Sequence, residues 1–279
     1  MSLIAGLLAG LILILFIALI LLLTPQMRQR GGGRLRPLAG YAAAREAIAR
    51  AAEQGRTTHL SAGPGTLGDS TSGTAETLAG LYLMGRAAQH CAAGGTPVLA
   101  TTGGALAFPL AENVVRAGFA AVGRTDEVPV VGAASTASAP VTLEGAAQGV
   151  RMLAHRDPLA YAAAAADLTE REGVSNALLV GNWGAEYLLV GEAQRRAGVP
   201  AVAGATDPAA LATMVLGADH TLIGEEIYTA GAYLEANPAH QASIRAQDLI
   251  RGLIIVLILL GTLLATAGIP LDTLLGASR

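Results

Sequence analysis

Lysine is missing from this sequence, since all 18 basic residues are arginine. A Schiff-base enzyme needs a lysine amine, and a conventional P-loop needs a lysine that reaches the outer phosphates of a nucleotide. Both classes are therefore excluded. Charged residues make up only 14% of the chain, and the net charge is −3. The chain as a whole lacks the basic character of a nucleic-acid-binding protein, so we expect no nucleic-acid partner.

Cysteine and histidine are also scarce. The single cysteine, Cys91, cannot form an internal disulfide, which suits a reducing compartment. We expect it to be a small buried side chain on a helix. The five histidines are scattered without the close pairing of metal ligands, so no metal site is predicted. The sequence identifies no cofactor.

Charge is absent from two long apolar runs. Leu3–Leu23 is long enough, at about 1.5 Å per helical residue, to cross a hydrocarbon core of roughly 30 Å. The residues before it carry no charged side chain and "TPQMRQR" follows it, which favours a retained anchor over a cleaved signal peptide. The second run is Gly252–Ile269. The predicted segments are a transmembrane helix (1–23), a basic linker (24–36), an α/β domain (37–248), a second transmembrane helix (249–269) and a tail (270–279).

Arginines flank the two runs on one side only. The tails beyond the runs contain only Arg279. The positive-inside rule therefore predicts a protein of the cell (inner or cytoplasmic) membrane, with residues 24–251 in the cytoplasm and both termini outside. The lipid bilayer is then its first partner. The arginines that decide the orientation are Arg28, Arg30, Arg34, Arg36, Arg245 and Arg251.

Small residues four apart occur in both runs, as Gly6 with Gly10 and as Gly261 with Ala265. Such spacing lets membrane helices approach closely. The two spans are therefore expected to pack together or to drive self-association. Confinement to a membrane raises the effective concentration of such contacts. We expect a homo-oligomer.

Short apolar runs alternate with alanine-rich helical segments between the two spans. A helix is expected to end at Gly55, followed by strands that are bounded by helices on both sides, which is typical of a buried parallel sheet. The predicted fold is α/β, with a Rossmann-like, mostly parallel, layered sheet flanked by the two transmembrane helices. The predicted strands are Thr57–Ser61, Pro97–Thr101, Val128–Gly132, Ala177–Gly181, Val199–Ala203 and His220–Ile223. The predicted helices are Thr74–Ala93, Ala105–Ala121, Leu143–His155, Pro158–Glu172, Ala185–Ala197, Pro208–Leu216 and Glu225–Glu235.

The loop "SAGPGTLGDSTSGTAET", Ser61–Thr77, follows the first predicted strand and precedes a helix. Free backbone N–H groups at such a place favour an anion, but Asp69 and Glu76 bring negative charge to it. A capped helix start is the alternative interpretation. The residues of this loop that we predict to bind a small polar ligand are Gly63, Gly65, Gly68, Asp69, Ser70, Thr71 and Ser72.

Glycine- and hydroxyl-rich loops also follow the other predicted strands. Because the carboxyl ends of parallel strands meet at one edge, these loops converge on one small-molecule pocket. In "GNWGAE" the tryptophan is the only one in the chain and could stack on a ring. A tight turn with the tryptophan lying over the core is the alternative. The ligand-binding residues predicted in these loops are Thr102, Ser135, Asn182, Trp183 and Glu186.

Two alternative functions follow from the same loops. "GDS" at Gly68–Ser70 resembles the nucleophile block of GDS-type esterases, whose later motifs have counterparts in "GNW" and in "NPAH". The match departs from that family because threonine follows Ser70 and Asn237 replaces the acid that orients His240. A nucleotide-handling enzyme is the second enzymatic alternative. Whether any reaction is catalysed is left open, and no catalytic residue is assigned.

Four stretches carry a broader resemblance: "GPGTLGDSTSGTAETLAGL", "DPLAYAAAAADL", "GNWGAEYLL" and the closing apolar run. Together with the first run they resemble a bacterial family of two-pass membrane proteins, a domain of unknown function. The resemblance covers nearly the whole chain and implies a membrane location without an assigned activity. We therefore predict a membrane protein whose domain binds a small polar ligand or self-assembles as a scaffold. A transport accessory subunit is a further alternative.

Overall fold

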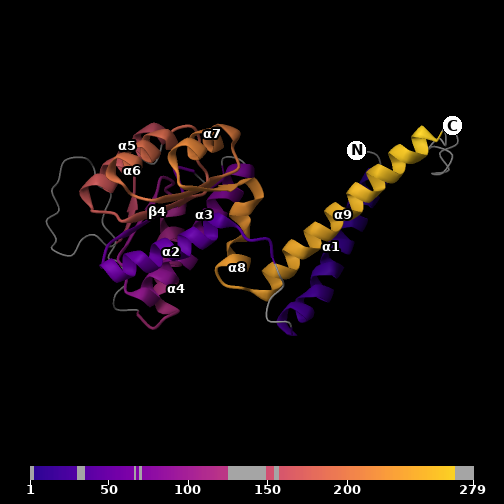
Figure 1. The fold of residues 1–279 in the computed structure, drawn as a ribbon, viewed down its shortest axis with the longest axis horizontal. Helices are drawn as coiled ribbons and strands as arrows, with labels where there is room; N and C mark the ends of the chain where they lie inside the picture. Colours follow the sequence, from indigo (N-terminus) through magenta and orange to yellow (C-terminus); the bar gives the residue numbers. More distant parts are fainter. Residues whose placement is uncertain are drawn as a thin grey trace. The chain divides into compact units, whose positions relative to one another are not determined.

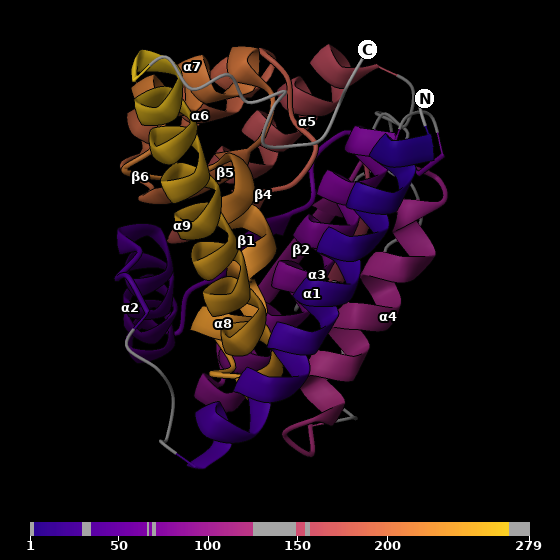
Figure 2. The ribbon, with the colours of Figure 1, turned by 90° about the vertical axis from the view of Figure 1, so that its right-hand side faces the viewer.

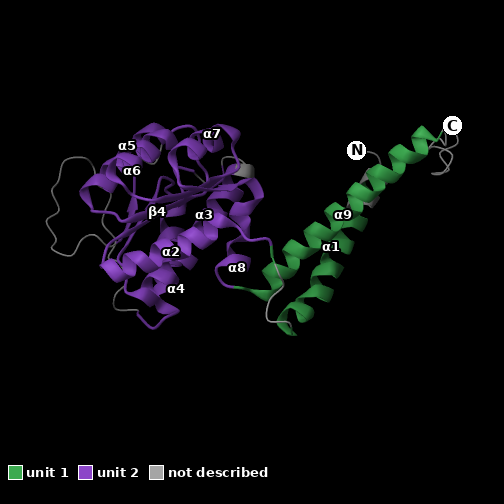
Figure 3. Cartoon of the chain, in the orientation of Figure 1, with its two compact units in different colours: residues 1–35, 236–279 green, residues 36–235 purple. Residues whose placement is uncertain are grey.

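A computed structural model describes residues 3–29, 35–65, 67–68, 71–124, 149–153 and 157–267. The chain divides into two compact units (Figure 3). One consists of residues 1–35 and 236–279, and the other of residues 36–235. The first unit is a helix pair and the second is an α/β domain.

The helix pair consists of α1 (Leu3–Gln29) and α9 (Pro238–Thr266), which run side by side in opposite directions (Figure 1 and Figure 2). Both are long and apolar enough to cross a membrane. Most of the leucine and isoleucine side chains between Leu253 and Leu263 are exposed. A continuous apolar surface of this kind is unfavourable in water and is typical of contact with lipid or with another protein.

The apolar runs of the two helices are offset along the pair. A groove between the helices is lined by Ile12, Leu13 and Phe16 together with Gln247, Ile250 and Arg251. The start of the α9 apolar run therefore lies level with the middle of the α1 apolar run. Arg251 lies 3.9 Å from the Asp248 carboxylate on its own helix, so this level of the pair also carries charge.

The α/β domain is built on a six-stranded parallel sheet with the strand order β3-β2-β1-β4-β5-β6. This is the order of a doubly wound fold, and it confirms the predicted α/β class. The order reverses between β1 and β4, which pair directly in the middle of the sheet. The strands are β1 (Thr58–Ser61), β2 (Val98–Thr102), β3 (Gly149–Met152), β4 (Asn176–Val180), β5 (Ala201–Ala205) and β6 (His220–Ile223).

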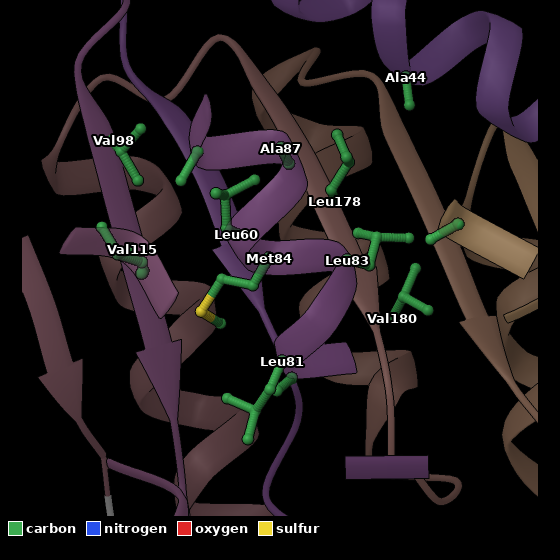
Figure 4. Packing of buried hydrophobic residues seen from close by; sticks show 14 of the residues in the cluster. Ala44, Leu60, Leu81, Leu83, Met84, Ala87, Val98, Val115, Leu178 and Val180 are labelled. Carbon is green, nitrogen blue, oxygen red and sulfur yellow. The ribbon is translucent and has the colours of Figure 1, made fainter. Parts of the chain in front are cut away.

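Helices cover both faces of the sheet, with α2, α3 and α4 on one face and α5, α6 and α7 on the other (Figure 1). Each face has its own apolar core. Leu60, Leu178 and Val180 contribute to the first core, where they pack with Met84 and other residues of α3 (Figure 4). The helices of the domain are α2 (Ala39–Gln54), α3 (Thr71–Gly94), α4 (Ala107–Ala120), α5 (Pro158–Arg171), α6 (Tyr187–Ala197), α7 (Pro208–Gly217), the 3₁₀ helix η2 (Gly224–Thr229) and α8 (Ala230–Tyr233).

Local signals set several helix ends. Gly55 is the C-cap of α2 in a left-handed conformation, as predicted. Asp157, Asp207 and Asn237 are N-caps whose side chains accept backbone N–H bonds, and each is followed by a proline. Cys91 is fully buried in the first core, as expected, and burial raises the pKa of its thiol to about 12.

Two predicted elements differ from the structure. The helix predicted over Leu143–His155 is wrong, because Gly149–Met152 is strand β3 at the edge of the sheet. Its backbone pairs with β2, a contact that the local sequence does not reveal. The helix predicted over Glu225–Glu235 is a 3₁₀ helix followed by a short α-helix. The strand predicted at Val128–Gly132 lies outside the described residues.

Candidate functional site

The loops that follow β1 and β4 pack against each other at the point where the strand order reverses. Gly63 adopts φ 86°, and a Cβ atom there would overlap the carbonyl oxygen of Asn182. At Gly65 a Cβ atom would overlap the Asn182 side chain. These two glycines are thus required by the approach of the neighbouring loop, before any ligand is considered.

The rest of the β1–α3 loop is described only in part. Gly68 is exposed, and its N–H donates to the Thr74 hydroxyl over 2.9 Å. Thr71 and Ser72 belong to the first turn of α3, but their side chains are not described. Asp69, Ser70 and Ser135 lie outside the described residues. The structure therefore brings Gly63 and Gly65 of this loop together with Asn182.

Thr102 lies at the carboxyl end of β2, next to the same loop. The N–H of the following Gly103 donates to the Gly63 carbonyl over 3.1 Å. The Thr102 hydroxyl is buried, and it has no hydrogen-bond partner among the described residues. A buried hydroxyl without a partner is unfavourable and is uncommon in native proteins.

The β4–α6 loop contains the other predicted residues. Glu186 accepts the N–H of Gly184 over 2.7 Å, so its carboxylate stabilises the turn. Trp183 is only 1% exposed and makes edge-on contacts with Tyr161 and Tyr187 at centroid distances of 5.6 and 5.7 Å. Its indole Nε1 is buried and, in the described part of the chain, has no hydrogen-bond partner. The ring belongs to the second core and does not form an open stacking surface.

A cluster of buried polar side chains lies next to the β1–α3 loop. The Ser61 hydroxyl accepts the Gly63 N–H over 3.0 Å and hydrogen-bonds to the Tyr161 hydroxyl over 2.6 Å. Tyr161 also contacts the Thr101 hydroxyl, which reaches Nε2 of His59 over 2.9 Å. Burial, and to a smaller extent the nearby Arg151, lowers the pKa of His59 to about 4. His59 is therefore neutral at pH 7 and acts as part of the core.

Sequence reasoning did not select Glu76, which has an unusual environment. It belongs to α3, one turn before Gly80, where the missing side chain lets the helix lie directly on the Val180 carbonyl of β4. Glu76 is only 5% exposed and makes no ion pair within the described chain. Burial first, and then the Asp207 carboxylate at the carboxyl end of β5, raises its pKa.

The third group around Glu76 comes from η2. Burial, followed by the negative charge of Glu76, raises the pKa of Tyr228. Glu76 lies in α3, which follows β1, Asp207 is the N-cap of α7, which follows β5, and Tyr228 lies in η2, which follows β6. The acidic character of position 76 was visible in the sequence, but its burial depends on packing between distant segments.

Comparison with protein families matches residues 4–132 and 144–274 to DUF6754, a domain of unknown function. The chain belongs to the DUF6754 family. The match covers nearly the whole chain, including both apolar helices and the loops described above. A comparison with curated proteins found no match, and neither did a comparison with solved structures.

The described residues of this DUF6754 protein provide no geometry that supports the esterase alternative. Asn237 is the N-cap of α9, since its side-chain oxygen accepts the Ala239 N–H over 3.0 Å. Its place before a proline is thus explained by the start of a helix. His240 follows on the same helix, in the helical unit, and Ser70 is outside the described residues. Over the described ranges, no group of three or more metal-ligating side chains occurs.

Proposed function

We propose that this DUF6754 protein is a two-pass membrane protein whose α/β domain binds a small ligand with a positively charged group at the carboxyl edge of the sheet. The site is formed by the β1–α3 loop, the start of α3 and the loop after β5. The observation that carries the proposal is Glu76, which is only 5% exposed and has no ion pair in the described chain, and whose pKa is raised by burial and by the charge of Asp207.

A buried carboxylate is unfavourable unless it is neutralised by a proton or by a partner. Asp207 makes the ionised form of Glu76 still less favourable. A cationic ligand supplies the missing counter-charge, and it is attracted by both carboxylates. A phosphate group is repelled by the same pair. The absence of lysine and the presence of Glu76 therefore both argue against a phosphate ligand at this site.

Further polar groups at this edge favour a ligand that also forms hydrogen bonds. The hydroxyl of Thr102 and the indole N–H of Trp183 lie around the Gly63 loop, buried and without partners in the described ranges. Carboxyl-edge loops are the usual ligand position in open α/β sheets. The ligand proposed is therefore small, cationic and polar.

The experiment is a thermal-unfolding assay of the full chain in mild detergent with simple amines, from ammonium to 1,4-diaminobutane. We expect at least one amine to raise the melting temperature of the wild type and of Glu170→Gln, a control at an exposed carboxylate. The same amine should not stabilise Glu76→Gln, which keeps the shape of the side chain but loses the charge. An equal response of the two variants, or no response of the wild type, refutes this site.

The membrane part of the proposal places residues 24–251 in the cytoplasm. It is supported by the two long apolar helices and by the arginines between the two apolar runs. Cysteines introduced at Ser2 and Ser278 should react with a membrane-impermeant maleimide in intact cells, whereas one at Arg45 should not. Labelling of the cysteine at Arg45 alone would show that the orientation is the reverse of the one proposed.

Self-association through the membrane helices is a second candidate function. Gly6 and Gly10 lie on one face of α1, and a Cβ atom at either would meet nothing within 4 Å. This small-residue face is therefore open to a second copy of the helix. Light scattering in mild detergent should show a discrete oligomer that Gly10→Leu weakens. A strictly monomeric wild type would contradict this candidate.

A further inference from the structure

A second polar pocket lies at the opposite, amino end of the sheet. Its volume is ≈ 250 Å³. The C-terminal half of α2 forms one wall, and the segments that lead into β4 and β5 form the others. The polar side chains that line the pocket are Arg50, Gln54, Arg56, Ser175 and Asn176. None of the residues of the carboxyl-edge site contributes to it.

Two arginines give the pocket a positive charge. Arg50 contacts the Glu46 carboxylate over 3.1 Å, but both side chains are more than half exposed, so this pair is weak and easily exchanged. Arg56 donates one hydrogen bond to the Gly173 carbonyl over 3.2 Å. No carboxylate neutralises Arg56 among the described residues. Its remaining N–H donors and its charge are available to an anion.

Asn176 provides an independent observation at the same place. This side chain is only 2% exposed, and the two N–H groups of its Nδ2 are shared among the Ala47 carbonyl, the Thr58 hydroxyl and the Ser175 hydroxyl, at 3.1, 3.1 and 3.3 Å. Its Oδ1 atom is buried and, in the described part of the chain, accepts no hydrogen bond. Asn176 is one of the residues that line the pocket, so an acceptor without a donor belongs to the same pocket-lining set as Arg50 and Arg56.

We propose that this pocket binds a small oxyanion that carries a hydroxyl group, for which hydrogen phosphate is the simplest example. Its anionic oxygens accept hydrogen bonds from Arg50 and Arg56, and its hydroxyl donates to Oδ1 of Asn176. An oxyanion without a proton, such as sulfate, satisfies the arginines but leaves the asparagine oxygen unpaired. Removal of a buried partner of this kind is costly, so the pocket should prefer phosphate to sulfate.

The site does not depend on the proposed function, because it uses other residues and a ligand of opposite charge. The two experiments are therefore separable. An amine that acts through Glu76 leaves the arginine pocket untouched, and phosphate that acts through the arginines leaves Glu76 untouched.

The experiment is a titration of the full chain in phosphatidylcholine nanodiscs with inorganic phosphate, followed by calorimetry at constant ionic strength. Arg50→Gln and Arg56→Gln should each weaken phosphate binding about tenfold or more, because each removes a charge-assisted hydrogen bond. Arg45→Gln removes the same charge from the exposed face of α2, outside the pocket, and should change the affinity less than about twofold. Sulfate should bind about tenfold more weakly than phosphate.

Four results would overturn the proposal. The first is no phosphate binding by the wild type. The second is equal loss in Arg45→Gln and in the two pocket variants, which would indicate a general charge effect. The third is equal binding of sulfate and phosphate, which would remove the role of Asn176. Heat released only when phosphatidylglycerol replaces part of the lipid would likewise refute a free phosphate ligand.

Discussion

At the scale of single residues, two kinds of constraint meet at the carboxyl edge. The glycines of the β1–α3 loop are fixed by contact with the β4–α6 loop, as Gly63 against Asn182 shows. In the described chain, Glu76 is buried without an ion pair, and the buried Thr102 hydroxyl has no hydrogen-bond partner. The backbone of the edge is therefore explained by packing, whereas its polar side chains are not.

Substitution of Gly63 by alanine tests the packing part. Its φ of 86° disfavours a side chain, and the Cβ atom would also overlap the Asn182 carbonyl. We expect Gly63→Ala to lower the free energy of unfolding by about 2–3 kcal/mol. Gly55→Ala has a similar φ of 63° but open space around the Cβ atom, so it should cost only about 1 kcal/mol. Denaturant unfolding of the full chain measures both, and equal losses would contradict the contact.

His59 predicts a pH dependence of stability. Its pKa is about 4 in the folded chain and 6.5 otherwise, so the unfolded state binds more protons between these values. The stability contributed by neutral His59 is present above about pH 6.5 and is lost as the pH falls towards 4, by about 3 kcal/mol in total. His59→Gln should flatten the unfolding free energy between these pH values, whereas His220→Gln, at an exposed position, should not. Parallel curves for wild type and His59→Gln would contradict this.

At the scale of elements, five of the six strands were predictable, including the edge strand β6, whose predicted bounds are the observed ones, whereas the other edge strand, β3, was not. Strands β1, β2, β4 and β5 are buried throughout, as expected of a parallel sheet covered on both faces, and their predicted bounds lie within one or two residues of the observed ones. Strand β3 pairs only with β2, and "GVRM" fits a helical pattern equally well. The candidate site shows the same limit, because the pKa of Glu76 is raised first by its burial and then by the charge of Asp207, which comes from a distant loop.

The helix pair makes a prediction about register. Leu13 and Ile250 line the same groove. If the two apolar runs instead left the membrane at the same level, at residues 23 and 252, Leu23 would lie level with the start of the α9 apolar run. We expect Leu13→Cys with Ile250→Cys to form a cross-link with a short bifunctional thiol reagent in lipid. Leu23→Cys with Ile250→Cys should not. Cys91 is buried and should not interfere. The opposite pattern would show that the helices slide past each other in the bilayer.

At the scale of the whole molecule, the two units have separate roles in the proposed function. The helical unit supplies two apolar helices that are long enough to cross a membrane. The α/β unit supplies a doubly wound sheet with polar groups at both ends. The family, a domain of unknown function, assigns no activity to either unit. The function proposed here therefore rests on the chemistry of the carboxyl edge.

The most direct test of that claim is a cryo-electron microscopy structure of the full chain, purified in mild detergent with the amine that stabilises it best. We predict additional density beside the Glu76 carboxylate, on the side that faces Asp207, with a cationic group within hydrogen-bonding distance of Glu76. An arginine or a backbone N–H group of the chain itself in that place, with no additional density, would contradict the account.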